Sequence, residues 1–534
     1  MKKSLCLLLS LSMALAGFSG CSAPQNEATP TPEGSAVPSH SPAEQPSSIP
    51  AASALSADIV VVGSGLSGMA AATYAAQNGA SVILVEKQGY FGGGIVASPG
   101  NMAVAEIAEN EAYHLSETTD TLAAALERWN SFIADTRESD SFDPDRVATL
   151  MVESMKTLSW LGEMGATFTP SFQMETNGLS GYRPDVPAIE SGLGGAKVVA
   201  MMQSAAENAG AQFLSGTTAT GLTLEDGKVK GVTVQTAEGE RIISAKAVIL
   251  AAGGFGANDE MVLQAVPELA QTGYYYQGIA ANTGDGITMA AEAGAATYDD
   301  GWVVATTLAP HGDLIAANKQ FGKLVEGMIY TVAVEGDAIE GASIADQIIV
   351  NKNAERVINE AANKSRQLAA LIDSGTAPYY ALYSGVSGEL SDILESGLST
   401  GFIFKADTLE DLAAAAGMDG AVLQSTVTAY NGYAASGNDE QFGKPAERLY
   451  AVANKGPYYL VRVVPSFVAT MGGVVTNKNY QALAADGSVI NGLYAVGEMA
   501  HRFLYTRHFI SGASNGFSVS MGKLAAEHAL TTIG

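Results

Sequence analysis

Residues 58–86 place a strand, a glycine-rich turn, a helix and a second strand in direct succession, and this order constrains the fold more than any other stretch. The first strand is the apolar run I-V-V-V after an aspartate. Gly63, Gly65 and Gly68 then have the spacing G-x-G-x-x-G, and an alanine-rich helical segment follows. The second strand ends on Glu86, about twenty residues after the glycines.

Each glycine has a separate physical role in this pattern. Gly63 permits a tight turn, Gly65 lets a pyrophosphate approach the backbone, and Gly68 lets the helix pack closely on the strand. The helix N-terminus offers unpaired N–H groups and the positive end of its dipole to phosphates. The carboxylate of Glu86 can accept hydrogen bonds from an adenosine ribose. The pattern predicts dinucleotide binding; the alternative is a glycine-rich turn without a ligand.

Charge and cysteine content exclude several classes of partner and site. The 534-residue chain carries 28 Lys plus Arg and 55 Asp plus Glu, which gives a formal net charge of −27. This charge argues against nucleic acid or an anionic membrane surface as an electrostatic partner. Both cysteines, Cys6 and Cys21, precede the predicted domains. We therefore expect no disulfide, iron–sulfur cluster, thiolate zinc site or cysteine nucleophile in the folded body.

The N-terminus has the features of an export signal. A basic start precedes a short apolar run at residues 7–16, which is too brief to span a membrane. The segment F-S-G-Cys21 resembles a bacterial lipoprotein signal, which implies removal of residues 1–20 and lipidation of Cys21. The alternative is an ordinary secretory peptide with an incidental cysteine. Residues 21–57 are rich in Pro, Ser and Ala and predict a flexible lipidated linker. The expected location is therefore extracytoplasmic, on the cell surface or the periplasmic face, with membrane contact only through the lipid.

Further motifs follow the first glycine turn in a recognisable order. They are Phe91-Gly-Gly-Gly94 through Asn101, Ala247 to Gly256, Asn282-Thr-Gly-Asp285-Gly, Asn351 to Glu360, Thr470-Met-Gly-Gly473, Gly497-Glu498 and Ser511 to Gly516. In this order they resemble the flavoprotein subunit family of fumarate reductases and succinate dehydrogenases. That family also includes ene-reductases and 3-ketosteroid dehydrogenases. The resemblance covers residues 58–530.

The resemblance implies an α/β fold, with a Rossmann-like FAD-binding domain and an inserted α+β substrate-capping domain. The implied bounds are 58–259 for the first part of the FAD-binding domain, 260–455 for the capping domain and 456–534 for the C-terminal part of the FAD-binding domain. Some family members attach FAD to a histidine in the second glycine loop; this loop has none, so we expect non-covalent FAD. The implied cofactor-binding residues are Gly63, Gly65, Ser67, Gly68, Glu86, Lys87, Gly93, Gly94, Gly100, Asn101, Ala219, Asp285, Gly497, Glu498, Ala513, Ser514 and Asn515.

The family branch that reduces dicarboxylates binds its substrate with two histidines and an arginine, and protonates it with a second arginine. The corresponding positions in this sequence are Thr306, Ala469, Phe509 and Lys364. Three of the four are thus small or apolar. A dianion in a desolvated pocket needs paired charges, so we predict that fumarate is not the substrate. The aromatic residues between 467 and 509 suit a flat, largely apolar molecule with a conjugated carbonyl group.

The resemblance implies hydride transfer from reduced flavin N5 to the β-carbon of an activated alkene, followed by protonation of the α-carbon. Donors must also stabilise the developing enolate oxygen. Candidate acids are Lys364, Arg366 and Tyr505; the alternative for the first two is a solvated helix surface. Candidate enolate donors are the Gly512 N–H together with Tyr505 or His508. In the 3-ketosteroid branch a tyrosine occupies the position of His508, so the chain departs from that branch here.

These observations predict an extracytoplasmic FAD-dependent ene-reductase whose small-molecule alkene substrate is a phenylpropenoid-like or 3-oxo-steroid-like enone or enoate. No C-x-x-C-H haem motif and no fused flavin-carrier domain is visible in the sequence. The electron donor would therefore be a separate extracytoplasmic protein, either a flavin carrier or a cytochrome. Two alternatives keep the fold: a dehydrogenase running in the oxidative direction, and a fumarate reductase. A third is a flavin-carrying lipoprotein module without turnover.

Overall fold

The computed structural model describes residues 55–108, 110, 120–137, 139–174, 179–325, 334 and 337–533. The predicted lipidation site Cys21, the signal segment and most of the predicted linker lie outside these residues. The first strand begins at Leu55, just inside the segment predicted as linker. Within the described ranges, no helix combines the length and the apolar character that crossing a bilayer requires.

The larger of two main sheets has eight strands. Five parallel strands form its core, in the order β17 (Val489–Ala495), β9 (Gly239–Leu250), β1 (Leu55–Val62), β2 (Val82–Val85) and β6 (Gln212–Leu214). An antiparallel strand, β16 (Gln481–Leu483), lies at one edge, and β7 (Thr218–Glu225) and β8 (Lys228–Thr236) extend β9. Residues 59–62 and 82–85 are buried throughout, as strands of a parallel sheet covered on both faces must be. The predicted strand, turn, helix and strand unit is confirmed.

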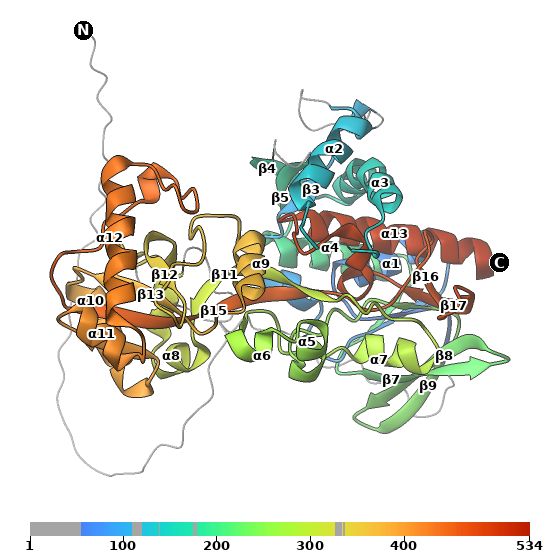
Figure 1. The fold of residues 1–534 in the computed structure, drawn as a ribbon. Coiled ribbons are helices and arrows are strands. Elements are labelled where there is room, and N and C mark those ends of the chain that lie inside the picture. Colours follow the sequence, from blue (N-terminus) through green and yellow to red (C-terminus); the bar gives the residue numbers. More distant parts are fainter. Residues whose placement is uncertain are drawn as a thin grey trace, which may run out of the picture. The chain divides into compact units, whose positions relative to one another are not determined.

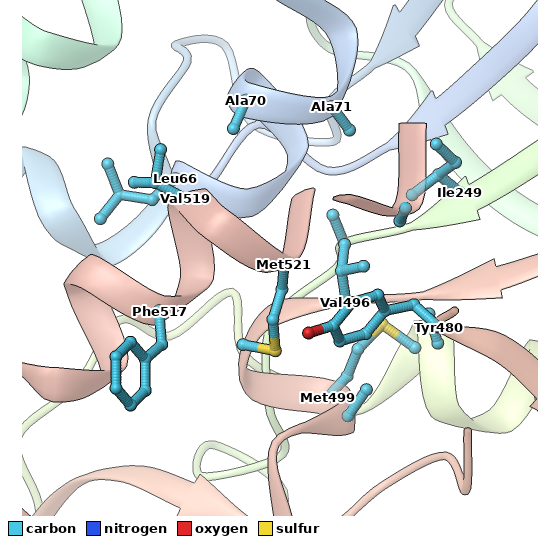
Figure 2. Packing of buried hydrophobic residues seen from close by; sticks show 14 of the residues in the cluster. Leu66, Ala70, Ala71, Ile249, Tyr480, Val496, Met499, Phe517, Val519 and Met521 are labelled. Carbon is cyan, nitrogen blue, oxygen red and sulfur yellow. The ribbon is translucent and has the colours of Figure 1, made fainter. Parts of the chain in front are cut away.

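Helices α1 (Leu66–Gln77) and α13 (Ala513–Ile533) pack against each other beside this sheet (Figure 1). Small residues permit the close approach, because a Cβ on Gly522 would overlap the carbonyl oxygen of Ser67. Figure 2 shows Leu66 and Ala70 of α1 in one cluster with Val519 and Met521 of α13. The C-terminal helix therefore returns to the first helix, and residues 513–515 belong to its first turn.

A small sheet and three helices pack into the same core cluster. The sheet consists of β3 (Met102–Val104), β5 (Leu179–Asp185) and β4 (Thr167–Met174), in that order. The helices are α2 (Leu122–Ile133), α3 (Pro144–Glu163) and α4 (Gly194–Asn208). Asp143 caps α3 by accepting hydrogen bonds from the N–H groups of residues 145 and 146.

The second main sheet has six strands built around β15 (Tyr458–Met471). This long strand pairs with β10 (Tyr275–Tyr276), β11 (Trp302–Pro310), β13 (Tyr379–Ser384) and β14 (Ile403–Ala406), and β12 (Ile348–Val350) pairs with β13. Figure 1 shows β15 alongside β11. The remaining helices are α5 (Asp259–Ala265), α6 (Leu269–Thr272), α7 (Asp285–Glu292), α8 (Gly312–Ala317), α9 (Lys364–Ser374), α10 (Gly388–Ser396), α11 (Leu409–Ala415) and α12 (Gly420–Ser436). β15 lies within residues 456–534, which the sequence analysis placed in the FAD-binding domain. Its strand partners, however, all lie within residues 260–455, the predicted capping domain.

Candidate functional site

Most of the predicted cofactor-binding residues follow strands of the parallel sheet at the same edge. β1 leads into Gly63, β2 into Glu86, β9 into the glycines at 253 and 254, and β17 into Gly497. The carboxyl ends of parallel strands meet at one edge, and ligands of open α/β sheets bind outside that edge. The topology therefore gathers these segments from distant parts of the sequence.

The turn after β1 has the conformation expected of its three glycines. Gly63 has a φ of +98°, and its N–H donates to the carbonyl of Val85 at 2.9 Å. A Cβ on Gly68 would overlap the carbonyl oxygen of Gly63, whereas a Cβ on Gly65 would have no atom within 4 Å. The turn is thus closely packed at Gly63 and Gly68 and open at Gly65, where α1 begins. An open helix N-terminus of this kind can receive phosphates.

The carboxylate of Glu86 is held over the same turn. Its Oε2 accepts hydrogen bonds from Ser64 N at 3.0 Å and Ser64 Oγ at 2.6 Å, and its Oε1 accepts one from Gln88 N at 2.9 Å. The side chain is buried. Glu86 is therefore fixed at the end of β2, at the position predicted to contact a ribose.

The second glycine loop lies against the first and against the start of α13. A Cβ on Gly93 would lie 3.5 Å from the Cα of Gly65. Further along the loop, Asn515 Nδ2 donates to the carbonyl of Asn101 at 2.8 Å, and Ala103 N donates to the carbonyl of Gly512 at 3.0 Å. The structure therefore brings the predicted residues of the second glycine loop next to those of the 512–515 segment.

The other residues of these two segments share this neighbourhood. Gly94 has open space at its Cβ position, and Gly100 has a φ of +77°. Ala513 is fully buried, and Ser514 Oγ lies 3.1 Å from the hydroxyl of Tyr505. Ser67 is buried beneath Gly497, where a Cβ would overlap its Oγ.

Lys87 and Asp285 form an ion pair between the end of β2 and the start of α7. Lys87 Nζ lies 2.6 Å from Asp285 Oδ2 and donates to Thr283 Oγ1 at 2.8 Å. Burial acts to raise the pKa of Asp285, but hydrogen bonds from Lys87 and Thr283 lower it overall. Ala219 lies in β7, the strand against which α7 packs. The predicted pair at 87 and 285 is therefore in contact.

Glu498 follows β17 and is surrounded by neutral donors. Its Oε1 accepts hydrogen bonds from Thr470 N at 2.8 Å and Thr470 Oγ1 at 3.0 Å, and its Oε2 accepts one from Asn282 Nδ2 at 3.3 Å. A Cβ on Gly254 would overlap the same carboxylate. Burial raises the pKa of Glu498 to about 7, against the effect of these hydrogen bonds. Such a carboxylate can accept hydrogen bonds from a polyol chain.

These features fit the parts of FAD: open backbone for the pyrophosphate, Glu86 for the ribose and Glu498 for the ribityl chain. A family model described as "FAD binding domain" matches residues 58–511. The chain belongs to this FAD-binding family. It is the family of the fumarate reductase and succinate dehydrogenase flavoproteins, and the predicted fold and FAD cofactor are confirmed.

Three similar proteins illustrate the range of the family. The flavoprotein is 31% identical over 476 residues to "Fumarate reductase (cytochrome)" of Shewanella frigidimarina, covering 88% of this chain and 76% of the relative. It is 28% identical to "Vinyl phenol reductase" of Lactiplantibacillus plantarum, covering 88% of this chain and 96% of that one. The crystal structure of 3-ketosteroid delta1-dehydrogenase from Sterolibacterium denitrificans matches with a TM-score of 0.69 at 22% identity, covering 89% of this chain and all of that chain, which is a likeness of fold. The flavoprotein is an FAD-dependent oxidoreductase acting on CH–CH bonds.

Thr470, which donates to Glu498, lies on β15 close to an irregularity in the second sheet. Two register shifts between β11 and β15 leave Thr306 and Val468 outside the paired register. Val468 and Ala469 are partly exposed in β15, and Thr306 and Thr307 are partly exposed in β11. Phe467 is fully buried against the rings of Tyr274 and Tyr276. A hydroxylic and an aliphatic side chain therefore stand at 306 and 469, two positions predicted to lack histidine.

The candidate catalytic residues lie in two segments, the loop 505–512 and the first turn of α9. Tyr505 and His508 are buried, and Gly512 has a φ of +79°. Lys364 and Arg366 occupy the first turn of α9, which Asn363 caps. Arg366 donates to the carbonyl of Phe132 at 3.1 Å, and its charge contributes to lowering the pKa of His508. The first turn of α9 and the loop 505–512 thus face a common region.

An ion cluster that the sequence did not reveal ties α9 to this loop. Arg507 donates to both oxygens of Asp135 at 2.6 Å, and to the two oxygens of Asp373 at 2.8 and 2.9 Å. Asp373 belongs to α9, and Asp135 follows α2. His508 lies 3.9 Å from Asp135, and burial lowers the pKa of His508 to about 4, so its imidazole is neutral at pH 7. Acidic residues at 135 and 373 gave no signal in the sequence because they are isolated from each other and from any motif.

Proposed function

We propose that this flavoprotein is an extracytoplasmic reductase of a C=C bond conjugated to a carbonyl group, and that its substrate is an apolar or aromatic enone or enoate rather than fumarate. The family membership supports the reaction class, since the relatives reduce or dehydrogenate carbon–carbon bonds. The uncharged residues at 306 and 469 support the substrate class.

One observation carries the substrate assignment: the buried arginines at 502 and 507 are already paired with carboxylates. Arg507 is shared between two carboxylates, and Arg502 donates to Asp300 Oδ2 at 2.9 Å. His508 is neutral, and uncharged residues stand at 306 and 469. A dicarboxylate bound beside these residues would find both arginines already paired, and a charge left uncompensated there costs several kcal/mol.

The loop 505–512, the first turn of α9 and the aromatic residues around Phe467 have separable roles in this proposal. Bound FAD supplies the hydride that reduces the substrate. The N–H of Gly512 and the His508 ring bind the carbonyl oxygen and stabilise the enolate. Lys364 at the start of α9 holds the proton that the α-carbon receives, with Arg366 and Tyr505 as the other candidate donors. The buried aromatic cluster around Phe467 excludes water.

The N-terminal sequence supports an anchored location. Cys21 would carry the lipid, and residues 22–54, which precede β1, would form the linker to the enzyme. A separate flavin carrier or cytochrome would deliver electrons outside the cytoplasm. Mass spectrometry of the protein purified from membranes tests this directly: a diacyl-modified Cys21 as the first residue is expected, and an unmodified or retained N-terminus contradicts it.

The experiment for the reaction uses the FAD-loaded protein under anaerobic conditions with reduced methyl viologen as donor. Benzylideneacetone, methyl cinnamate and a 3-oxo-steroid enone are compared with fumarate. We expect kcat/KM for at least one neutral substrate to exceed that for fumarate by at least about tenfold, the factor that 1.4 kcal/mol of lost charge compensation gives. Faster turnover of fumarate would overturn the substrate class, and the absence of turnover with every alkene would favour a flavin carrier.

A further inference from the structure

The segment that leads into α9 is anchored to the second sheet by a buried carboxylate. Residues 359–363 are irregular and end at the cap of α9, and Lys364 follows directly. Glu360 Oε1 accepts hydrogen bonds from the N–H of Ile349 in β12 at 3.0 Å and from Arg356 Nε at 2.9 Å. The side chain of Glu360 is fully buried. The chain is therefore fixed four residues before Lys364.

Buried ion pairs hold the same carboxylate from its other side. Arg356 Nη2 donates to Glu360 Oε2 at 2.8 Å, and Lys444 Nζ lies 3.3 Å from the same oxygen. Asp439 Oδ2 lies 2.9 Å from Arg356 Nη1. All four side chains are buried, and their charges balance. Since an ion left unpaired in the interior is costly, Glu360 keeps this position.

Gln367 connects α9 back to this anchored segment. Its Nε2 donates to the carbonyls of Glu360 and Ala362, both at 2.8 Å. Carbonyl oxygens only accept, so the NH2 group of the amide must face them, and both of its protons are used. Neither carbonyl accepts a backbone N–H from the described residues. The buried amide of Gln367 thus satisfies two carbonyls that the backbone leaves open.

The position of Gln367 on the helix relates these contacts to Lys364. Residues three apart share one face of a helix, and helical side chains lean toward its N-terminus. Gln367 therefore reaches back across the first turn of α9, which carries Lys364, to the segment that Glu360 anchors. A group that transfers a proton must be held to within about 0.5 Å of its productive position. Without the amide, nothing in these contacts ties the first turn to the anchor.

We propose that Gln367 is a positioning residue for the proton donor: its amide fixes the first turn of α9 and so holds Lys364 where it protonates the substrate α-carbon. This inference rests on the proposed enone reduction, with Lys364 as its acid. Gln367 acts only through the backbone of residues 360–364. Its loss should therefore lower kcat and leave the binding of FAD and of substrate unchanged.

Gln367→Met tests this, because it removes the amide at nearly constant side-chain length. kcat and KM are measured for the FAD-loaded protein with reduced methyl viologen and whichever of benzylideneacetone, methyl cinnamate and the 3-oxo-steroid enone is reduced fastest. We expect kcat to fall at least about tenfold with KM within about threefold, because a misplaced acid loses stabilisation only in the transition state. Gln367→Asn keeps the amide but is too short to reach both carbonyls, and it should also lower kcat selectively.

Ser374→Ala is the matched control at the other end of α9. It removes a hydrogen bond of 2.8 Å to the carbonyl of Leu371. This variant should leave kcat unchanged even if it lowers the stability of the helix. An equal loss of kcat in Ser374→Ala would show a general structural effect and would overturn the inference.

A double-mutant cycle with Lys364→Met decides whether Gln367 acts through Lys364. In the Lys364→Met background, Gln367→Met should change kcat by less than about threefold, because the group that it positions is gone. If Gln367→Met does not fold, Gln367→Asn takes its place in the cycle. Equal losses of kcat in both backgrounds would overturn the inference, as would natural kcat in both Gln367 variants or a loss of FAD affinity in flavin titration. Failure of the proposed reaction gives a different result, since the natural protein then reduces none of the alkenes and the role of Gln367 is rejected with it.

Discussion

Thr470 donates twice to one oxygen of Glu498, from its N–H at 2.8 Å and from its Oγ1 at 3.0 Å. Thr470 Oγ1 in turn accepts from Phe255 N at 3.2 Å, so its single proton is directed at the carboxylate. The nearby His501 Nε2 lies 2.8 Å from the Thr470 carbonyl, and burial lowers the pKa of His501 to about 4. The imidazole is then neutral, and Glu498 has no compensating charge from this neighbour.

Glu498 should make the stability of the FAD-free protein depend on pH. Burial raises its pKa to about 7 from an ordinary value of 4.5. The contribution of Glu498 to the free energy of unfolding is therefore complete below pH 4.5 and is lost as the pH rises through 7. We expect Glu498→Gln to become more stable than the natural protein over this interval, by roughly 3 kcal/mol at the alkaline end. Urea denaturation of the two apoproteins at several pH values measures the difference.

The control for this experiment is Glu240→Gln, which removes an exposed carboxylate from β9. Its stability should follow that of the natural protein at each pH. A Glu498→Gln difference that stays constant with pH would contradict the assignment of a raised pKa to this group.

Arg507 should stabilise the fold rather than neutralise a charge on the substrate. Its side chain and that of Asp135 are nearly inaccessible, and Arg507 holds the pKa of Asp135 well below its usual range although burial acts in the opposite direction. Arg507→Met leaves a buried carboxylate unpaired, and we expect a loss of about 3–5 kcal/mol in the free energy of unfolding. Thermal and urea denaturation measure this loss.

The double variant Arg507→Met/Asp135→Asn removes the unpaired charge and should recover at least half of the loss. The same double variant should leave the ratio of enone to fumarate activity unchanged. A selective loss of activity with a stable fold would show instead that Arg507 binds the substrate.

The elements that sequence alone could predict are those encoded by adjacent residues. The unit from β1 to β2, its three glycine conformations and the position of Glu86 were all found as expected, since they depend on local spacing. The predicted domain boundary at residue 455 did not indicate that β15 belongs to the six-stranded sheet. β15 is apolar along most of its length, so its sequence gives no sign of the strands with which it pairs.

The polar contacts around β15 could not be predicted for a similar reason. Gln277 and Ser466 are 189 positions apart, and Thr306 and Ser466 are 160 apart. Their contact depends on the pairing of β10 and β11 with β15 and on two register shifts between β11 and β15, which no local pattern indicates. Arg507 is also far from its partners in sequence, 372 positions from Asp135 and 134 from Asp373.

Gly65 and Gly68 should respond differently to the same substitution. Gly65 has a φ of −62° and free space at its Cβ position, so Gly65→Ala should leave the apoprotein within about 0.5 kcal/mol of the natural stability. It should nevertheless lower FAD affinity by at least about tenfold, because the methyl group occupies the approach to the backbone. Gly68→Ala would overlap the Gly63 carbonyl and should destabilise the apoprotein by about 1–3 kcal/mol. Flavin titration measures the loss of FAD affinity, and thermal denaturation measures the loss of stability. Equal loss of stability in both variants would contradict the free space at the Cβ position of Gly65.

Lys364 should contribute to protonation of the substrate α-carbon rather than to substrate binding. It begins α9 directly after the Asn363 cap, and the same helix is joined to the 505–512 loop by the ion pair of Arg507 with Asp373. We expect Lys364→Met to lower kcat by at least about a hundredfold with KM within threefold, because a general acid contributes chiefly in the transition state. Reoxidation of the photoreduced, FAD-loaded protein by benzylideneacetone measures the step in a single turnover. Arg366→Met, two residues further along the same helix turn, removes the alternative candidate donor and should leave most of the rate, and Lys364→Arg should restore part of the rate. Full activity of Lys364→Met would remove this residue from the mechanism and move the assignment to Arg366 or Tyr505.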